Sequence, residues 1–286
     1  MKSKYFNIII ISVFSILFFS CDKIEEPYIK DEAVIWNGRK SIILDFTGHT
    51  CGNCPDAHKT IDELIEKFGD ALVPVAVHST YFAMPETEDT SKAFHYDFRT
   101  DFGDFWAGRD YGMGYLGEIY LPTGLINNLN PNALANTNTW ANEIASVITT
   151  YPEYKIEITP SFSNTDSLAK ADIKIITNIK NSKKLSILVF IIEDGIIQWQ
   201  KNYKENPNNI KDYEHNHVLR ASFNGNFGDK IKDNNTETII GNIISKSYSL
   251  KIKKDWNINN CSIVAFIYDT ETNEVLQAEI TKILNE

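Results

Sequence analysis

The sequence predicts two folded domains, an α/β domain followed by an all-β domain. The chain has 286 residues, 43% of them hydrophobic, which is enough for two domains of ordinary size. In the first half, apolar residues recur at helical spacing between two short apolar runs. Beyond Pro152, polar and apolar residues alternate, as in strands with one buried face. We therefore place one domain at residues 37–152 and the other at 153–286.

The first twenty residues have the pattern of a targeting segment. A positively charged start precedes an apolar run over residues 8–19, which is shorter than the roughly 20 residues of a membrane-spanning helix. Cys21 follows a small residue, and this resembles the lipobox of bacterial lipoproteins. The resemblance implies a signal peptide at residues 1–20, lipid attachment to the membrane at Cys21 and a tether at residues 21–36. The alternatives are an ordinary signal peptide or an uncleaved anchor with an incidental cysteine.

The charge of the chain excludes one class of partner. The formal net charge is −10, and it becomes −12 once the two lysines of the leader are removed. A protein with this acidic balance is poorly suited to bind nucleic acid.

The first domain begins with a strand–helix–strand unit. Residues 41–46 form a short apolar run that predicts a buried strand. Apolar residues at three- and four-residue spacing predict a helix over 56–68, and Gly69 is a typical helix end. Residues 72–78 predict a second strand. Short connections between these elements predict that the two strands are parallel.

The rest of this domain is less regular. Residues 81–117 are rich in aromatic side chains and too long for a simple connection. We expect a helix near residues 90–98 within them. A strand over 119–126, with a proline near its start, and a helix over 139–150 then complete the domain.

The second domain is predicted to be an antiparallel sandwich of immunoglobulin-like type, because about seven short strands follow one another between Asn-, Gly- and Asp-rich turns. The expected strands cover residues 154–159, 172–177, 185–192, 217–223, 247–252, 262–269 and 274–280. Cys261 is expected to be a buried cysteine at a strand edge. His215 and His217 are expected on one face of a strand, as polar or turn contacts. A metal site is the alternative, although no third ligand is visible.

Cys51 and Cys54 form the motif with the clearest chemical implication. They lie between the first strand and the helix that follows it. Unpaired N–H groups at a helix start favour a thiolate, so Cys51 is expected to be an exposed nucleophile. Cys54, one turn into the helix, would be the buried resolving thiol.

Other uses of the cysteine pair are less well supported. A c-type haem site needs histidine after the second cysteine, where Pro55 stands, and a zinc site needs a second ligand pair. A copper-like Cys/Cys/His site that includes His58 stays open. His49 is expected either to lower the Cys51 pKa, if protonated, or to be an exposed loop residue.

These residues resemble the thioredoxin superfamily. Asp45 lies six residues before Cys51, and the resemblance implies that it moves protons during exchange. The Leu-Pro-Thr run at Pro122 resembles the cis-proline element that faces the dithiol, which implies a cis bond there. Thr50 departs from the usual tryptophan, and Gly-Asn from the usual Gly-Pro, so the redox potential cannot be transferred. Residues 81–121 exceed a minimal thioredoxin and would form either a lid or peptide-contacting wall, or the aromatic core of an inserted helix.

The whole chain resembles the outer-membrane-protein-28-related lipoproteins of the Bacteroidetes. The segments that carry this resemblance are residues 45–58, 215–221 and 260–266. The resemblance implies outer-membrane localisation and a thioredoxin-like domain followed by a β-sandwich. It implies no substrate.

Two functions follow. The first is an envelope thiol–disulfide oxidoreductase that acts on protein thiols without a cofactor or metal, in which Cys51, Cys54, Asp45 and Pro122 form the catalytic site. The second is a binding or adhesion lipoprotein whose disulfide is structural.

Overall fold

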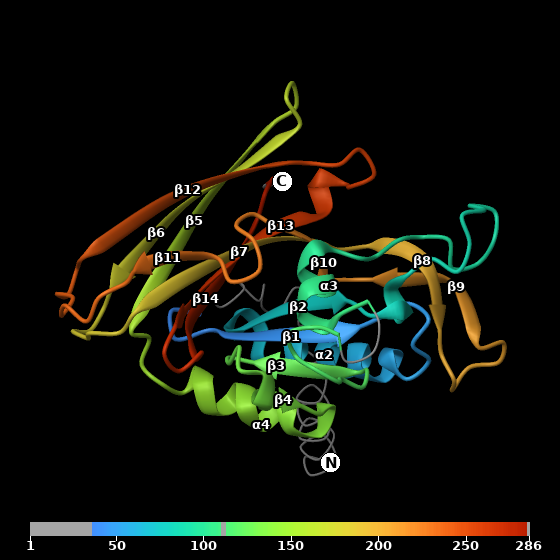
Figure 1. Cartoon of the computed structure of the whole chain (residues 1–286), viewed down its shortest axis with the longest axis horizontal. Coiled ribbons are helices and arrows are strands. Elements are labelled where there is room, and N and C mark those ends of the chain that lie inside the picture. Colours follow the sequence, from blue (N-terminus) through green and yellow to red (C-terminus); the bar gives the residue numbers. More distant parts are fainter. Residues whose placement is uncertain (1–35, 110–112, 285–286) are drawn as a thin grey trace, which may run out of the picture. The chain divides into compact units, whose positions relative to one another are not determined.

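The computed structural model describes residues 36–109 and 113–284 (Figure 1). The predicted leader, the lipidation site at Cys21 and all but the last residue of the predicted tether lie outside this range. Within the two described stretches, no helix has the length and apolar character needed to cross a membrane.

A nine-stranded sheet joins strands from both halves of the chain. Its order is β14-β13-β7-β10-β2-β1-β3-β4, with β11 paired to β7. The strands are β1 (Ser41–Thr47), β2 (Leu72–His78), β3 (Thr123–Ile126), β4 (Leu134–Ala135), β7 (Leu185–Glu193), β10 (Val218–Ser222), β11 (Asp229–Lys232), β13 (Cys261–Asp269) and β14 (Val275–Lys282). The strands β1 and β2 are parallel, as predicted. The two halves meet where β10 pairs with β2, at Val218 and Ala76.

The described residues of the first half form three α-helices: α2 (Cys54–Phe68), α3 (Asp101–Ala107) and α4 (Thr137–Ile148). The helix α2 begins with a proline in its first turn, where the missing N–H costs least, and ends at Gly69 with a φ of 53°. Its apolar stripe packs with α4 on one face of β1. Phe102 and Trp106 of α3 belong to the core on the opposite face.

Alternation along β1 decides which side chains lie beneath α2. Ile43 packs in the core that α2 and α4 share, whereas Leu44 and Phe46 pack in the core with α3. Successive side chains of a strand point to opposite faces. Asp45 therefore lies on the same face as Ile43, beneath α2.

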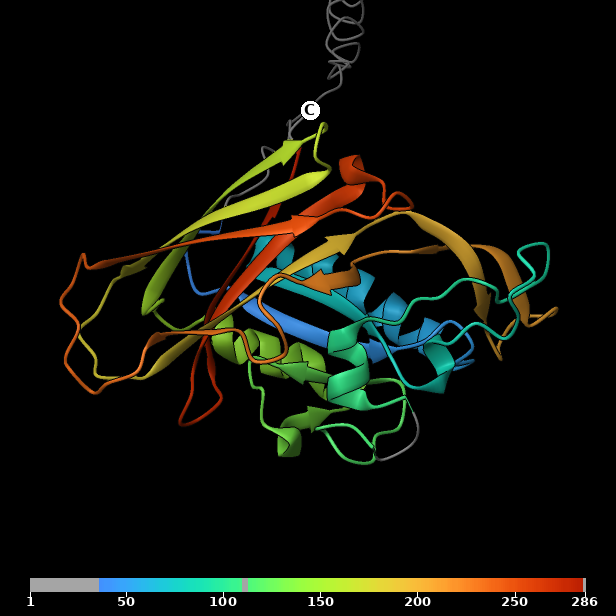
Figure 2. The same cartoon turned by 45° about the horizontal axis from the view of Figure 1, so that its top comes forward.

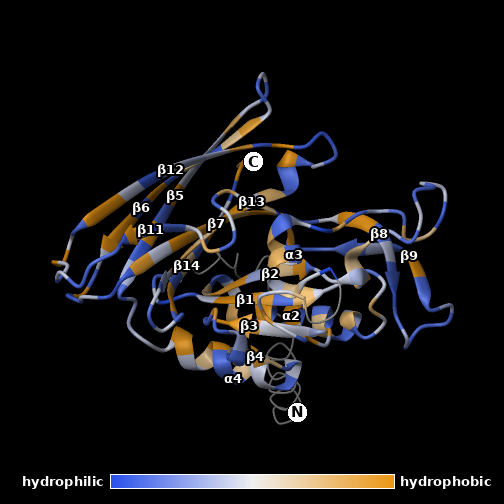
Figure 3. Cartoon of the chain, in the orientation of Figure 1, coloured by the Kyte–Doolittle hydropathy of each residue, from blue (hydrophilic) through white to orange (hydrophobic). Residues whose placement is uncertain are grey.

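The second half is all-β in its described part and has two layers. The strands β5 (Tyr154–Ser163), β6 (Leu168–Thr177) and β12 (Ile243–Lys251) form a three-stranded antiparallel sheet. This sheet shares a core with β7 and β13 and lies over them in both views (Figures 1 and 2). Figure 3 shows apolar residues concentrated on the central strands and hydrophilic residues in the outer loops.

A further hairpin was not predicted. The strands β8 (Ile196–Lys201) and β9 (Asn209–His215) pair only with each other. This hairpin connects β7 to β10 along the chain. It extends toward the first half of the chain (Figure 1). Only scattered residues of β9 face inward, so its sequence lacks the alternation that marked the other strands.

Most predicted elements are present, but two expectations are wrong. Residues 90–98 form no helix, because Asp89 and Asp97 accept hydrogen bonds from backbone N–H groups two residues on and Phe94 has a φ of 55°. The strand expected over 119–126 begins only at Thr123. Short 3₁₀ helices complete the structure at Gly69–Ala71, Tyr81–Ala83, Pro131–Ala133 and Ile258–Asn260.

Candidate functional site

Cys51 and Cys54 form a disulfide where β1 passes into α2. Cys54 is the first residue of the helix, and its N–H donates to the Cys51 carbonyl. Cys54 is fully buried, as expected, but Cys51 is only 3% exposed. The prediction that Cys51 is exposed is therefore wrong.

The end of β8 and the turn that follows it contact the loop that holds the disulfide. The Gln200 side-chain amide donates to the carbonyl of Cys51 at 3.1 Å, and the Tyr203 N–H donates to the carbonyl of Gly52 at 2.9 Å. The Tyr203 ring lies against Gly52, where an added Cβ would approach it to 2.6 Å. Residues distant in sequence thus bury Cys51, and no local signal in the sequence announces them.

Asp45 is a buried carboxyl group below α2. Its exposed fraction is zero, and neither carboxyl oxygen has a hydrogen-bond partner among the described residues. Burial raises the pKa of Asp45 to about 8. The carboxyl group is therefore mostly protonated at neutral pH.

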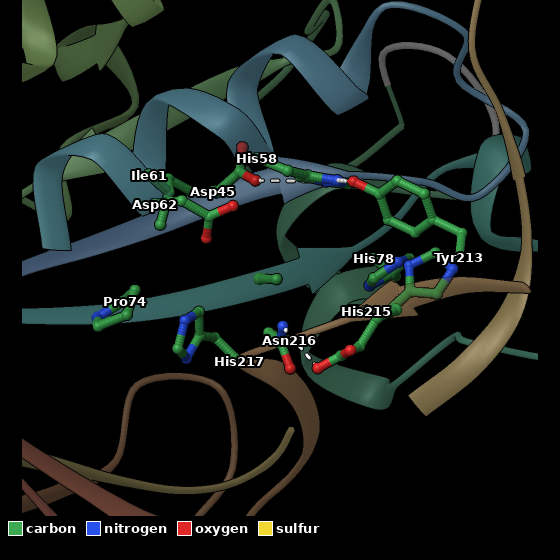
Figure 4. Close-up of a pocket in the computed structure, with 12 residues that line it drawn as sticks. Asp45, His58, Ile61, Asp62, Pro74, His78, Tyr213, His215, Asn216 and His217 are labelled. Carbon is green, nitrogen blue, oxygen red and sulfur yellow. Dashed lines mark hydrogen bonds and ion pairs between the residues drawn. The ribbon is translucent and has the colours of Figure 1, made fainter. Parts of the chain in front are cut away.

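His58 lies between Asp45 and the hairpin (Figure 4). Its Nε2 is 2.8 Å from Thr47 Oγ1 and 3.9 Å from Asp45 Oδ2. Its Nδ1 is 2.8 Å from the hydroxyl of Tyr213 on β9. Burial, followed by the charge of His217, lowers the pKa of His58 to about 4, so the ring is neutral. Because both ring nitrogens are engaged, this arrangement does not support the copper-like site.

A pocket of about 50 Å³ opens between α2, β2 and the end of β9. Asp45, His58 and Tyr213 lie along it, and Figure 4 shows them converging from three elements. Exposed Asp62 and Glu214 also line it. In the described part of the chain, no group of three His, Cys, Asp or Glu side chains is arranged to hold a metal.

Two further histidines, His78 and His215, lie in this region. Both are buried, their ring centroids are 5.3 Å apart, and burial keeps both pKa values well below the ordinary value. His215 ends β9, whereas His217 follows it with a φ of 57°. The prediction that His215 and His217 share one strand face is wrong. His217 instead contacts Asp194 at 3.1 Å, which is a turn contact.

His49 matches neither expectation. It is fully buried against Phe94 and Phe98, and its Nε2–H donates to the Met84 carbonyl at 3.1 Å. Burial lowers the pKa of His49 to about 4. A neutral ring at this position cannot stabilise a Cys51 thiolate by charge.

The other residues singled out in the sequence lie as follows. The Leu121–Pro122 peptide bond is cis, as predicted. Pro122 precedes β3, whose pairing with β1 places Gly124 opposite Asp45. Cys261 is buried at the start of β13, and burial raises the pKa of its thiol to about 12, in line with the expected small apolar role.

Sequence reasoning missed three residues of the site: Gln200, Tyr203 and Tyr213. All belong to the unpredicted hairpin. His78 was also missed, although the sequence held a signal for it. It is the last residue of β2, and the other six residues of this buried strand are apolar.

Comparisons with known proteins support the family resemblance. A family model described as outer membrane protein Omp28 matches residues 115–286. No curated protein matches the sequence.

Two solved structures from Porphyromonas gingivalis are similar. HBP35 has a TM-score of 0.58 and 15% identity, over 86% of this chain and 76% of its own. At this identity it supports a similar fold alone. A domain of the outer membrane lipoprotein Omp28 has 22% identity over 46% of this chain and 88% of its own, with a TM-score of 0.32.

Proposed function

The chain belongs to the outer membrane protein Omp28 family, and from this premise we propose that it is a lipid-anchored thiol–disulfide exchange protein of the outer membrane. Cys51 and Cys54 are the reacting pair, and the substrate is a protein thiol or disulfide. In this proposal the first half is a thioredoxin-like domain, the second an immunoglobulin-like sandwich, and Cys21 carries the lipid.

The observation that carries the proposal is the buried carboxyl group of Asp45. Burial of a polar group without a hydrogen-bond partner is unfavourable by roughly 1–3 kcal/mol in proteins. A purely structural disulfide has no use for such a group. A dithiol that gains and loses protons does, because a protonated acid can supply a proton to a departing thiolate.

The exchange step balances as follows. A substrate thiolate sulfur bonds to Cys51 Sγ while the Cys51–Cys54 bond breaks. The electron pair of that bond goes to Cys54 Sγ, which takes the proton of the Asp45 carboxyl group. The substrate sulfur is oxidised and the Cys54 sulfur is reduced. Pro122, before β3, would shape the contact with the substrate chain.

A second candidate function is favoured by one observation. Cys51 is only 3% exposed and the hairpin covers it, as expected for a structural disulfide in a binding or adhesion lipoprotein. This candidate predicts a disulfide that resists reduction and binding that survives removal of both cysteines.

Substitution of Cys51 tests the proposal. Cys51→Ser is expected to abolish reduction of insulin disulfides and formation of mixed disulfides, because the sulfur that forms the mixed disulfide is lost. Cys261→Ser is the matched control, since the Cys261 thiol is buried at the start of β13. Full exchange activity in Cys51→Ser would refute the proposed function.

A further inference from the structure

Exposed apolar side chains gather at one end of the three-stranded sheet. Ile239 and Ile240, in the loop before β12, are both 64% exposed, and Ile243, the first residue of β12, is 56% exposed. Tyr151, between α4 and β5, is 68% exposed. Single exposed apolar residues are ordinary, whereas a contiguous group marks an interaction surface. These four residues are called the apolar end below.

Hydrogen bonds bring the two segments of the apolar end together. In the loop before β12, the Gly241 N–H donates to the Thr177 carbonyl of β6 at 2.8 Å. The side chain of the next residue, Asn178, donates to the Pro152 carbonyl at 3.0 Å. The isoleucine loop and the segment of Tyr151 are thus bound to consecutive residues at the end of β6.

The chain enters the fold beside the apolar end. The Gln277 side-chain amide donates to the Gly38 carbonyl at 3.3 Å and to the Tyr154 carbonyl at 3.1 Å. The Arg39 guanidinium donates to Thr150 Oγ1 at 3.3 Å. Both contacts place the entry of the chain next to the segment between α4 and β5.

The predicted lipid at Cys21 would keep this end of the fold near a bilayer. Trp36 follows Cys21 by 15 residues, and 15 residues span at most about 50 Å. A linkage of this length gives the apolar end a high effective concentration at the membrane, so weak apolar contacts are sufficient for docking. Trp36 and Tyr151 are also exposed, and both residue types favour the membrane–water interface.

The charges around the apolar end are balanced. Three lysines near it have glutamate partners: Lys155 with Glu157 at 2.9 Å, Lys180 with Glu237 at 3.8 Å and Lys183 with Glu153 at 2.6 Å. This part of the surface therefore lacks the excess of acidic groups that gives the whole chain a net charge of −10. We expect apolar contact, and not attraction between opposite charges, to hold it on a bilayer.

We propose that the apolar end docks on the lipid surface of the outer membrane and directs the disulfide away from it. The inference rests on the lipid attachment in the proposed function and not on thiol exchange. The chain enters before β1 and the disulfide follows β1, a strand of seven residues that spans about 20 Å. The start of β12 and the β8–β9 hairpin lie at opposite ends in both views (Figures 1 and 2). The disulfide would then face soluble partners.

The test measures how close the isoleucine loop lies to lipid. Ile240→Cys in the full lipidated chain is labelled with a thiol-reactive nitrobenzoxadiazole dye and reconstituted in vesicles of phosphatidylethanolamine and phosphatidylglycerol. The native cysteines of the described residues should not react, because Cys51 and Cys54 are joined and Cys261 is buried. The Cys21 thiol carries the lipid in the proposal. Lipids with a nitroxide near the headgroup quench a dye that lies at the membrane surface.

Ile197→Cys is the matched control, because Ile197 is also an exposed isoleucine, at 51%, but lies on β8. We expect nitroxide lipids to quench the label at residue 240 at least about twofold more than the label at residue 197, because docked apolar residues reach about 5–10 Å into the headgroup region. The difference should persist at high salt, which screens attraction between charges.

Equal quenching at both positions, in a chain that floats with the vesicles in a density gradient, would overturn docking and leave the lipid attachment intact. Loss of the difference at high salt would overturn the apolar contact. If the dye at residue 240 shifts to the blue with rising protein concentration in detergent, and quenching in vesicles is equal, the surface binds a second copy of the chain and the proposal is wrong. A wild-type chain that does not float with the vesicles would instead refute the lipid attachment, and this inference with it.

Discussion

At the scale of single residues, burial keeps the titratable side chains of the site in their neutral forms. Asp45 is buried and protonated, whereas His49 and His58 are buried and deprotonated. Each state avoids a charge in a poorly solvated place. The site therefore holds protons in a way that the sequence alone does not reveal.

Replacement of Asp45 by asparagine is expected to stabilise the oxidised protein near pH 8. Burial raises the pKa of Asp45 to about 8, so between the unfolded-state value and pH 8 the folded protein holds a proton that the unfolded chain has lost. This contribution makes the free energy of unfolding fall with rising pH, by about 1 kcal/mol per pH unit. Asp45→Asn removes that slope.

Urea unfolding at pH values between 6.5 and 8 measures this effect. Below pH 6.5 both proteins should gain stability as pH rises, because the unfolded chain protonates histidines that are neutral when folded. These histidines are His49, His58, His78 and His215. A difference between Asp45→Asn and wild type that is constant from pH 6.5 to 8 would contradict the assignment.

At the scale of elements, the β8–β9 hairpin contacts the loop that holds the disulfide. Its strands pair only with each other, and it rests on the loop through a few hydrogen bonds and the Tyr203 ring. Tyr213 and His215 anchor the end of β9, whereas Tyr203 in the turn is 61% exposed. We expect the turn to open at lower free energy than the anchored end, because exposed segments open first. Thiol exchange would then proceed from a state in which the hairpin has moved away from Gly52.

Weakening the hairpin contacts is expected to speed reduction of the disulfide. Gln200→Ala removes donation to the Gly48 and Cys51 carbonyls, and a loss of about 1–2 kcal/mol corresponds to a rate roughly 5- to 30-fold higher. Tyr203→Ala should act in the same direction by removing the ring over Gly52. The rate of reduction by dithiothreitol measures both effects.

Tyr151→Ala provides the control for Tyr203→Ala, because Tyr151 is similarly exposed but lies at the end of the first half. Its reduction rate should equal that of wild type. Unchanged rates in both hairpin variants would show that the hairpin does not limit access.

The sequence analysis singled out some residues of this site and missed others. Cys51 and Cys54 were singled out by their short motif before a helix, and Asp45 by the resemblance to the thioredoxin superfamily. Gln200, Tyr203 and Tyr213 were not, because their positions depend on a hairpin without alternation and on a fold that joins distant segments. The same limit applies to Cys51, whose burial depends on this long-range cover.

At the scale of the whole molecule, the two halves share a core. Phe102 of α3 packs on Phe190 of β7 with ring centroids 4.8 Å apart, and Phe190 packs on Phe266 of β13. Arg39, before β1, pairs with Glu274, just before β14. Lys40 pairs with Glu279 of β14. Residues on both sides of Pro152 therefore contribute to one hydrophobic core.

This shared core predicts that the halves unfold together. In the full chain, urea unfolding followed by tryptophan fluorescence and by far-ultraviolet circular dichroism should give coincident transitions. A fragment that ends at Pro152 should lack a cooperative transition, because it exposes Phe102 and Trp106. Two separate transitions in the full chain would contradict this expectation.

The reduction potential of the Cys51–Cys54 pair tests the central claim most directly. Titration of the full chain with glutathione, read out by mass spectrometry of the Cys51–Cys54 peptide, gives this value. An exchange protein is expected to lie between about −120 and −270 mV, the range of known catalysts. A potential below about −300 mV, with no mixed disulfide trapped at Cys51, would contradict the claim and mark the disulfide as structural.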